Sequence, residues 1–538
     1  MAQIERGSWD EMRAHHRWDL PANYNLAWDM VGKWAAAEPG RTALVHLPAD
    51  GPPVTWTHGA IDARANCLVN LLAAHGLEAG VRVAVLLPQS PEVILTHLAA
   101  YRAGAIVVPL FTLFGEEGLE YRLAHSGARL LLTDRANLPK IAAIRDRLPE
   151  LAHVFCIDGA GEGAHDLAEG LARASDSFAP VPTGPQTPAF ISYTSGTTGP
   201  PKGALHAHRV LLGHLPGVRL THEFLPRPGD VMWTPADWAW MGGLCNIAMP
   251  CLRFGVPLVS HRMERFDPER AFGQMARHGV RNVFLPPTAL KLMRRVERPE
   301  RFDLRLRSVG SGGESLGGEL LEWGRRAFGL TINEFYGQTE CNLVLGNCAS
   351  VMPVRPGSMG RPFPGSDVAI IDGEGNPLPA GETGEIAIRR GDAAMFLGYW
   401  KAPDKTAAKF AGAWMRTGDE GVMDPDGYFR FASRTDDVIT SSGYRIGPTE
   451  IEDCLTGHPA VAMAAAVGVP DPVRTEVVKA FVTLAPGHAP SDYLAASLIA
   501  HVRLRLSPHL APREIAFLER MPTTATGKIL RRDLRAGA

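Results

Sequence analysis

The stretch Ala189–Gly203, which reads AFISYTSGTTGPPKG, decides how the rest of this chain is understood. Its first residues predict a buried strand, and we expect a helix from His206 onward. Between them, glycines allow backbone N–H groups to converge on an oxyanion, the serine and threonines add hydroxyl donors, and Lys202 adds a positive charge. The order differs from the Walker pattern, because Gly199 is followed by Pro-Pro-Lys-Gly. The stretch therefore predicts a phosphate-binding loop, with a plain surface loop as the alternative.

Strand and helix patterns alternate on both sides of this loop, from about residue 42 to residue 340. A helix is expected at Pro91–Ala103. Strands are expected at Val81–Pro88, Ala105–Leu110, Arg129–Thr133, His153–Asp158, Ala189–Tyr193, Arg281–Leu285 and Leu306–Gly310. The alternation indicates βαβ units in mostly parallel sheets, and the length indicates more than one sheet.

The texture of the chain changes after about residue 365, where Gly and Pro turns join shorter strands. Strands are expected at Asp367–Ile371, Glu385–Arg389, Ala462–Val469 and Val477–Leu484, and helices at Pro448–Leu455 and Ser491–Leu506. Ser491 is expected to cap the last helix. We predict an N-terminal domain of residues 1–434 and a C-terminal domain of residues 435–538.

Bulk properties exclude several functional classes. The 538 residues exceed one ordinary core, so at least two domains are expected. A net charge of -2 without a basic stripe argues against a nucleic-acid partner. Seven cysteines without a Cys-x-x-Cys pair argue against a disulfide framework or a zinc site and favour a reducing compartment. The charged start is unlike a signal peptide, and no apolar run reaches ~18 residues, so we expect the cytoplasm and no membrane span.

Further motifs follow the loop in order: Ser311-Gly-Gly-Glu-Ser315, Tyr336-Gly-Gln-Thr-Glu340, Arg416-Thr-Gly-Asp419, Arg434–Gly447 and Pro522–Lys528. Together they resemble the signatures of the adenylate-forming (AMP-binding) superfamily of acyl-CoA synthetases, luciferases and peptide-synthetase adenylation domains. Within this superfamily, the sequence is most similar to medium-chain acyl-CoA synthetases. The resemblance implies an α/β fold with a large N-terminal domain of βαβ-type sheets, a small β-barrel-like subdomain, and a small mobile C-terminal α+β domain.

The resemblance also implies ATP, Mg²⁺ and coenzyme A as ligands. Tyr336 would stack on adenine, Asp419 would accept hydrogen bonds from the ribose diol, and Ser442 to Tyr444 would line the pantetheine path. The residues implied to bind nucleotide or coenzyme A are Thr194, Ser195, Gly196, Thr197, Thr198, Gly199, Lys202, Gly313, Glu314, Ser315, Tyr336, Gly337, Gln338, Asp419, Arg434, Arg445, Ser442, Gly443, Tyr444 and Arg503.

Three residues are implied to carry the chemistry. Lys528 matches the adenylation lysine of the family, Thr339 would touch the α-phosphate, and Glu340 would hold Mg²⁺ together with Thr197. Because Lys528 and the coenzyme A channel cannot face the site at once, the C-terminal domain is expected to turn about a hinge at Asp436.

The acid is expected to lie against Trp240, Met241, Gly242, Gly312 and Gly337. Acetate-specific relatives place a tryptophan at the position of Gly337, so the three glycines predict a cavity larger than acetate needs, for a short to medium-chain, branched or aryl acid. Neighbouring side chains that refill this space are the alternative.

We therefore expect an ATP-dependent acyl-CoA synthetase, an acid–thiol ligase whose small-molecule partners are a carboxylic acid, ATP and coenzyme A. Acetyl-CoA synthetase, an adenylate-forming ligase with another acceptor, and a non-catalytic nucleotide-binding protein remain alternatives. A Ser-His-Asp hydrolase has no Gly-x-Ser-x-Gly elbow in a suitable context. A homo-oligomer is left open.

Overall fold

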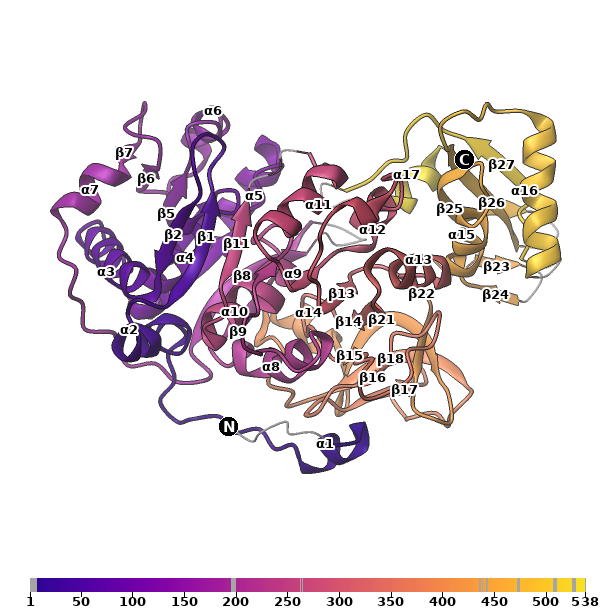
Figure 1. Ribbon diagram of the computed structural model, residues 1–538, viewed down its shortest axis with the longest axis horizontal. Coiled ribbons are helices and arrows are strands. Elements are labelled where there is room, and N and C mark those ends of the chain that lie inside the picture. Colours follow the sequence, from indigo (N-terminus) through magenta and orange to yellow (C-terminus); the bar gives the residue numbers. More distant parts are fainter. Residues whose placement is uncertain are drawn as a thin grey trace.

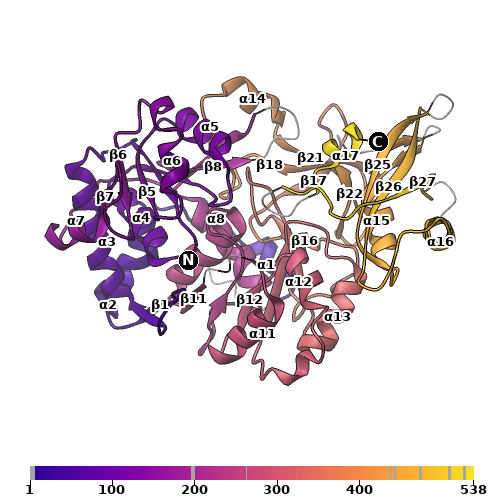
Figure 2. The ribbon, with the colours of Figure 1, turned by 90° about the horizontal axis from the view of Figure 1, so that it is seen from above.

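The computed structural model describes residues 7–194, 200–261, 263, 265–434, 437, 439–441, 444–471, 475–506, 510–524 and 529–537. The larger part of the molecule contains three sheets, and a smaller C-terminal part carries a fourth sheet of its own (Figure 1). Figure 2 shows both parts from above, with helix α16 (Asp492–Arg505) on the outer side of the smaller part.

An eight-stranded sheet contains the two strands that flank the predicted phosphate-binding loop. Its strands are β3 (Arg82–Leu86), β4 (Ile106–Pro109), β5 (Ala128–Thr133), β6 (His153–Cys156), β7 (His165–Asp166), β8 (Pro188–Thr194), β9 (Lys202–Ala207) and β19 (Gly398–Tyr399). The order is β19-β9-β8-β4-β3-β5-β6-β7. The pairings from β8 through β4, β3, β5 and β6 to β7 are parallel, whereas β9 pairs antiparallel with β8, and β19 antiparallel with β9.

A nine-stranded sheet lies beside the first one. Its strands are β1 (Thr42–Leu47), β2 (Val54–Thr57), β10 (Met232–Trp233), β11 (Leu258–His261), β12 (Asn282–Phe284), β13 (Ser308–Gly312), β14 (Asn333–Tyr336), β15 (Leu345–Gly346) and β16 (Arg361–Pro362). The order is β16-β15-β14-β13-β12-β10-β11-β1-β2, and the six central strands from β14 to β1 run parallel. Parallel neighbours bring the carboxyl ends of β13 and β14 together.

One apolar core is shared by the two sheets. Successive side chains of a strand point to opposite faces. Thus Val83 and Val85 of β3 enter the shared core, while Ala84 and Leu86 enter a second core on the other face. In the nine-stranded sheet Met232 joins the shared core, and its neighbour Trp233 joins a third core. These strands are buried on both faces, which explains why they read as continuous apolar runs.

Helices cover the faces of the sheets and connect their strands (Figure 1). The helices of the larger part are α1 (Trp9–His15), α2 (Lys33–Ala37), α3 (His58–Ala74), α4 (Pro91–Arg102), α5 (Glu116–Ser126), α6 (Leu138–Ala142), α7 (Leu167–Arg173), α8 (Val210–Thr221), α9 (Met241–Gly243), α10 (Met249–Phe254), α11 (Pro268–Arg277), α12 (Pro287–Met293), α13 (Gly318–Phe328) and α14 (Pro403–Ala408). Single turns of other helix types lie at η1 (Trp28–Gly32), η2 (Arg145–Arg147), η3 (Leu244–Ala248) and η4 (Pro299–Arg301).

Two smaller sheets follow along the chain. The antiparallel one contains β17 (Val368–Ile371), β18 (Thr383–Arg389), β20 (Phe410–Ala411), β21 (Trp414–Met423) and β22 (Phe429–Arg434). The C-terminal one contains β23 (Ile439–Ser441), β24 (Tyr444–Ile446), β25 (Val461–Asp471), β26 (Thr475–Leu484) and β27 (Glu514–Phe517). Helices α15 (Pro448–Thr456), α16 and α17 (Arg531–Ala536) accompany the C-terminal sheet.

The predicted fold class is confirmed, and each predicted strand overlaps a strand of the structure. The predicted cap of α16 is also confirmed, because the Ser491 hydroxyl accepts a hydrogen bond of 3.2 Å from the Leu494 N–H. The helix expected from His206 is wrong. His206 lies in β9, which folds back antiparallel onto β8, and helix α8 begins only at Val210. No helix among the described residues is long and apolar enough to cross a bilayer.

Candidate active site

The two arms of the phosphate-binding stretch form an antiparallel hairpin. Thr194 at the end of β8 lies opposite Lys202 at the start of β9, and its hydroxyl donates a hydrogen bond of 3.4 Å to the Lys202 carbonyl. The predicted ligands Ser195, Gly196, Thr197, Thr198 and Gly199 lie outside the described residues. The residues on either side of the loop, Thr194 and Lys202, are nevertheless paired across neighbouring strands.

The loop after β13 carries Gly313, Glu314 and Ser315. Gly313 has a backbone φ of +97°, a conformation that favours glycine. The Thr288 hydroxyl donates to the carboxylate of Glu314 at 3.3 and 3.4 Å. Because β13 and β14 are parallel neighbours, this loop lies next to the segment that follows Tyr336.

Asp419 is the centre of a hydrogen-bonded cluster. Its carboxylate is only 5% exposed. The Tyr336 hydroxyl and the Gln338 amide both donate to its Oδ2, the latter at 2.6 Å, and the Arg434 guanidinium lies 3.3 Å from its Oδ1. Burial and this carboxylate raise the pKa of Tyr336 well above its ordinary value, so the phenol keeps its proton and donates it. The structure therefore brings four predicted nucleotide ligands into direct contact.

Glu385 fixes the turn that presents Asp419. Its carboxylate accepts hydrogen bonds of 2.7 Å from the Gly418 N–H and from Nε of Arg416. Gly418 has a φ of +78°, and the Thr417 hydroxyl accepts from the Asp419 N–H at 3.1 Å. A buried carboxylate that accepts backbone N–H bonds holds a turn rigidly. The orientation of Asp419 thus depends on a residue of the neighbouring strand β18.

Glu340 is linked to the phosphate-binding hairpin through Tyr399. Glu340 is 7% exposed, and its Oε1 accepts a hydrogen bond from the Tyr399 hydroxyl. The Lys202 ammonium lies 5.3 Å from the centroid of the Tyr399 ring. Burial and the Glu340 carboxylate both raise the pKa of Tyr399. The predicted metal ligand and the lysine of the phosphate loop therefore contact the same tyrosine.

Thr339 is held by its backbone. Its carbonyl oxygen accepts a hydrogen bond of 2.8 Å from Nε2 of His206, whose ring stacks on Phe190. Burial lowers the pKa of His206 to about 3, so the ring stays neutral with its proton on Nε2. The strand β9 that replaced the expected helix therefore positions the Thr339-Glu340 pair.

Lys409 joins this site without having been predicted. Its Nζ donates to the Thr417 carbonyl at 3.2 Å. Burial lowers its pKa, although Glu340 and Asp419 favour the charged form. No local motif marks this lysine. Tyr399, in the segment Gly398-Tyr-Trp400, was likewise not among the predicted site residues.

The predicted acyl wall is partly filled. Trp240 is half-buried with its ring centroid 5.9 Å from that of Phe111, and Met241 is buried. A Cβ on Gly242 would lie 3.1 Å from the ring of Phe284.

Two of the three wall glycines are required by close packing. A Cβ on Gly312 would lie 2.5 Å from the Phe335 ring, and one on Gly337 would lie 2.3 Å from the Leu343 nitrogen. The prediction that these two glycines leave open space is wrong, because neighbouring groups occupy the position of the missing side chain. Gly242 is also closely packed, because 3.1 Å from a ring carbon is shorter than ordinary van der Waals contact.

A buried polar cluster borders Gly337 and was also missed. The Asn342 amide donates to Oδ1 of Asn246 at 2.6 Å and to Nε2 of His214 at 3.2 Å. His214 in turn donates from Nδ1 to the Val210 carbonyl at 2.7 Å. Asn246 lies one helical turn after Gly242. In the sequence, Asn342 lies only two residues after the motif Tyr336–Glu340, whereas Asn246 and His214 belong to no motif identified above.

The remaining predicted ligands belong to the C-terminal part. Tyr444 and Arg445 lie in β24, whereas Ser442, Gly443, Asp436 and Lys528 lie outside the described residues. Arg503 is exposed, and its helix α16 lies on the outer side of the C-terminal part (Figures 1 and 2). The structure therefore does not bring Arg503 to the Asp419 cluster.

Asp437 connects the C-terminal helix α17 to Arg434 of the Asp419 cluster. The Asp437 N–H donates to the Arg434 carbonyl at 3.0 Å. Its carboxylate pairs with Arg531 at 3.4 Å and with Arg535 at 2.8 Å. Arg531 also pairs with Glu452 at 2.6 Å. Helix α17, which starts three residues after Lys528, is thus tied to the turn that follows Arg434.

The chain is similar to known proteins over nearly its whole length. The AMP-binding enzyme model matches residues 31–400, and the AMP-binding enzyme C-terminal domain model matches residues 450–528. Acetyl-coenzyme A synthetase of Bacillus subtilis is 35% identical, covering 98% of this chain and 93% of that protein. Acyl-coenzyme A synthetase ACSM3, mitochondrial, of Mus musculus is 33% identical over the same shares.

A solved structure agrees over nearly the whole chain. The crystal structure of the anthranilate CoA ligase AuaEII in complex with anthranoyl-AMP has a TM-score of 0.89 and 30% identity, and the match covers 97% of this chain and 98% of that one. The resemblance drawn from the motifs is confirmed. The chain belongs to the AMP-binding enzyme family.

Proposed function

We propose that this chain is an AMP-forming acyl-CoA synthetase that acts on a carboxylic acid larger than acetate. The observation that carries this proposal is the meeting of three distant motifs at one place. Tyr399 links Glu340 to the hairpin of the phosphate loop, and Tyr336 and Gln338 link the same motif to Asp419. These contacts support the proposal that the predicted phosphate, metal and ribose ligands bind one nucleotide.

The nucleotide roles follow from the chemistry of these groups. Asp419 is an acceptor for the ribose hydroxyls, with Arg434 beside it, and Tyr336 offers a flat face to adenine. The site suits Mg²⁺, since Glu340 is a buried carboxylate and hard oxygen ligands are what this cation prefers. When bound there, Mg²⁺ would neutralise charge on the phosphates.

In the first half-reaction, a carboxylate oxygen of the acid attacks the α-phosphorus of ATP, and the bond to pyrophosphate breaks. The obstacle is electrostatic, because one anion approaches another. Lys528, Lys202 and the donors of the loop 194–199 offset that charge, and Thr339 contacts the α-phosphate. No covalent bond to the protein forms, so the products are an acyl-adenylate and pyrophosphate.

In the second half-reaction, the sulfur of coenzyme A attacks the acyl carbon, the bond to AMP breaks, and the thiol proton leaves to solvent. Free thiols have a pKa of ~8.5, so a useful thiolate fraction exists near neutral pH. We propose that residues 435–538 turn about Asp436 between the half-reactions, replacing Lys528 by the Ser442–Tyr444 segment.

The size of the acid is supported by the names of two relatives. The three glycines of the predicted wall add no support, because a Cβ on any of them would lie 3.1 Å or less from a neighbouring atom. The Mus musculus relative is named as an acyl-coenzyme A synthetase and AuaEII as an anthranilate ligase. The Bacillus subtilis relative keeps acetate as the alternative. Seven free cysteines support a reducing compartment, for which we propose the cytoplasm.

Separate assays of the two half-reactions test the proposal. ATP–pyrophosphate exchange should require the acid but not coenzyme A. Lys528→Ala should abolish exchange yet still form thioester from supplied acyl-AMP. Lys479→Ala, which removes an ammonium that pairs with Glu514 at 2.8 Å, should leave both half-reactions intact. Equal loss of both half-reactions in Lys528→Ala would refute the two-state assignment.

A panel of acids tests the substrate class. Acetate, propionate, octanoate, benzoate and anthranilate are compared by pyrophosphate release with coenzyme A present. We expect kcat/KM for the best larger acid to exceed that for acetate by at least about tenfold, since each buried CH₂ contributes about 0.8 kcal/mol. An acetate optimum would refute the pocket assignment but leave the synthetase activity standing.

A further inference from the structure

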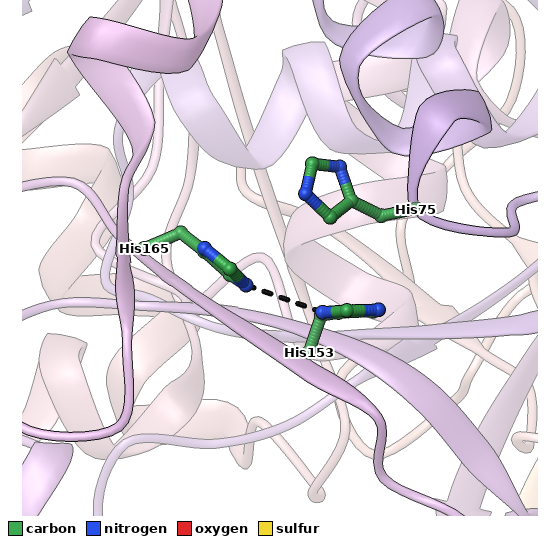
Figure 3. Close-up of side chains that lie close together, drawn as sticks. All are labelled: His75, His153 and His165. Carbon is green, nitrogen blue, oxygen red and sulfur yellow. Dashed lines mark hydrogen bonds between the residues drawn. The ribbon is translucent and has the colours of Figure 1, made fainter.

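Three histidines from separate segments meet at the end of the eight-stranded sheet that is remote from the C-terminal part (Figures 1 and 3). His75 follows helix α3, His153 begins β6, and His165 begins β7. Their positions in the sequence are 78 and 12 residues apart, so spacing motifs do not reveal the cluster. None of the three belongs to the nucleotide site.

The ring nitrogens of the three histidines converge. One nitrogen from each ring lies within 4.8 Å of those from the other two. His153 Nδ1 and His165 Nε2 are 3.2 Å apart (Figure 3). Nitrogen ligands about 2.0–2.1 Å from a tetrahedral zinc ion lie roughly 3.4 Å apart. One edge of the required tetrahedron is thus already formed, and the third nitrogen needs only a small side-chain adjustment.

His75 is prepared for such a role by its backbone contact. Its Nδ1 lies 2.9 Å from the Leu71 carbonyl oxygen, which can only accept, so Nδ1 carries the hydrogen. A neutral His75 therefore has its lone pair on Nε2. A carbonyl that orients one ring nitrogen while the other binds metal is the usual support of histidine ligands in metal sites.

The three histidines pack against a buried aromatic ring on one side and are open to solvent on the other. The Phe155 ring is buried and lies 5.1 Å from the rings of both His75 and His165. His75 and His153 are half-buried, whereas His165 is exposed. The ring contacts fix the orientation of the imidazoles, and the exposed side offers an entry path and room for a water ligand.

We propose that His75, His153 and His165 form a binding site for a divalent first-row cation such as Zn²⁺, held by three imidazole nitrogens. Imidazole is the ligand these cations share, and carboxylate is not needed. The bound ion would join the end of α3 to β6 and to β7, an edge strand of two residues whose one partner among the described strands is β6. The absence of a Cys-x-x-Cys pair, which argued against zinc, does not bear on a site made of histidines.

Metal analysis of the full-length chain without a histidine tag tests the proposal. Chelator-treated protein is dialysed against Zn²⁺ without nucleotide, and bound zinc is measured by mass spectrometry. Wild-type protein should retain one more zinc per chain than His165→Ala or His153→Ala. His488→Ala, which removes an exposed histidine in the C-terminal part, should retain as much as the wild type.

Thermal unfolding gives a second readout that does not depend on activity. Zn²⁺ at about ten times its Kd should raise the midpoint of the wild type and of His488→Ala by roughly 1–2 °C. Zn²⁺ should leave the unfolding midpoint of His165→Ala unchanged. His165 is exposed, so this variant is expected to fold. Equal zinc content and equal midpoint shifts in the wild type and His165→Ala would overturn the site, and leave the histidines as a packing cluster only.

Discussion

Replacement of Tyr399 by phenylalanine removes a single hydroxyl from the site. That hydroxyl donates to Oε1 of Glu340, a carboxylate that is 7% exposed. The ring remains and continues to pack against Phe396, 5.1 Å away between centroids. The substitution therefore tests whether the orientation of Glu340, rather than its presence, supports adenylation.

The expected magnitude follows from the type of bond. Hydrogen bonds to charged groups contribute about 1.5–3 kcal/mol. If the Tyr399 bond holds Glu340 in the geometry needed in the transition state, its loss lowers kcat/KM for adenylation roughly ten- to hundredfold, because each 1.36 kcal/mol is tenfold in rate. Glu340 would also hold Mg²⁺ less firmly, so the Mg²⁺ concentration for half-maximal rate should rise.

ATP–pyrophosphate exchange over a range of Mg²⁺ concentrations measures both effects. Tyr428→Phe is the matched control, since it removes a hydroxyl that donates to the Pro353 carbonyl at 2.8 Å, away from Glu340. It should cost about 1 kcal/mol of stability and leave exchange unchanged. An unchanged rate and an unchanged Mg²⁺ requirement in Tyr399→Phe would refute the role given to the Tyr399–Glu340 bond.

Three further substitutions probe other parts of the molecule. Burial raises the pKa of Glu334 to about 8, so the folded chain keeps a proton that the unfolded chain has lost, and stability falls as pH rises from about 5 to 8. This fall in stability is on the order of 4 kcal/mol, and Glu334→Gln should remove it. The variant should therefore have a higher unfolding midpoint than the wild type at pH 8.5, but not at pH 5. Gly337→Ala should destabilise the chain by about 1–3 kcal/mol in urea unfolding, because its Cβ would meet backbone, whereas Gly40→Ala, with open space, should not. Asp437→Asn weakens the pairing with the arginines of α17, so pyrophosphate exchange should slow several-fold while thioester formation from acyl-AMP is retained; equal slowing of both would contradict a role in placing Lys528.

Much of the site could be predicted from the sequence because its ligands occur in short ordered motifs. Tyr336, Gln338 and Glu340 share one segment of five residues, and Asp419 ends another. Apolar runs such as Val83–Leu86 identified the central strands, since strands buried on both faces must be apolar throughout. These features are local, so neighbouring residues carry enough information to recognise them.

Contacts between distant segments could not be predicted in this way. The helix predicted at His206 is wrong because this residue pairs with β8 on the other side of the loop. The local sequence around His206 does not record that pairing. Glycine type alone could not distinguish an open pocket from the close approach of Leu343 to Gly337. The position of a missing side chain is filled or empty according to what the fold places beside it.

The sequence by itself determined the family, the α/β class and the chemical types of the ligands, because each of these is encoded in local order and periodicity. Only the tertiary structure decided that Tyr399 connects Glu340 to Lys202, that Lys409 joins the same site, and that His75 meets two histidines far along the chain. Such pairings arise where packed strands and helices bring distant residues together, and no spacing in the linear chain records them.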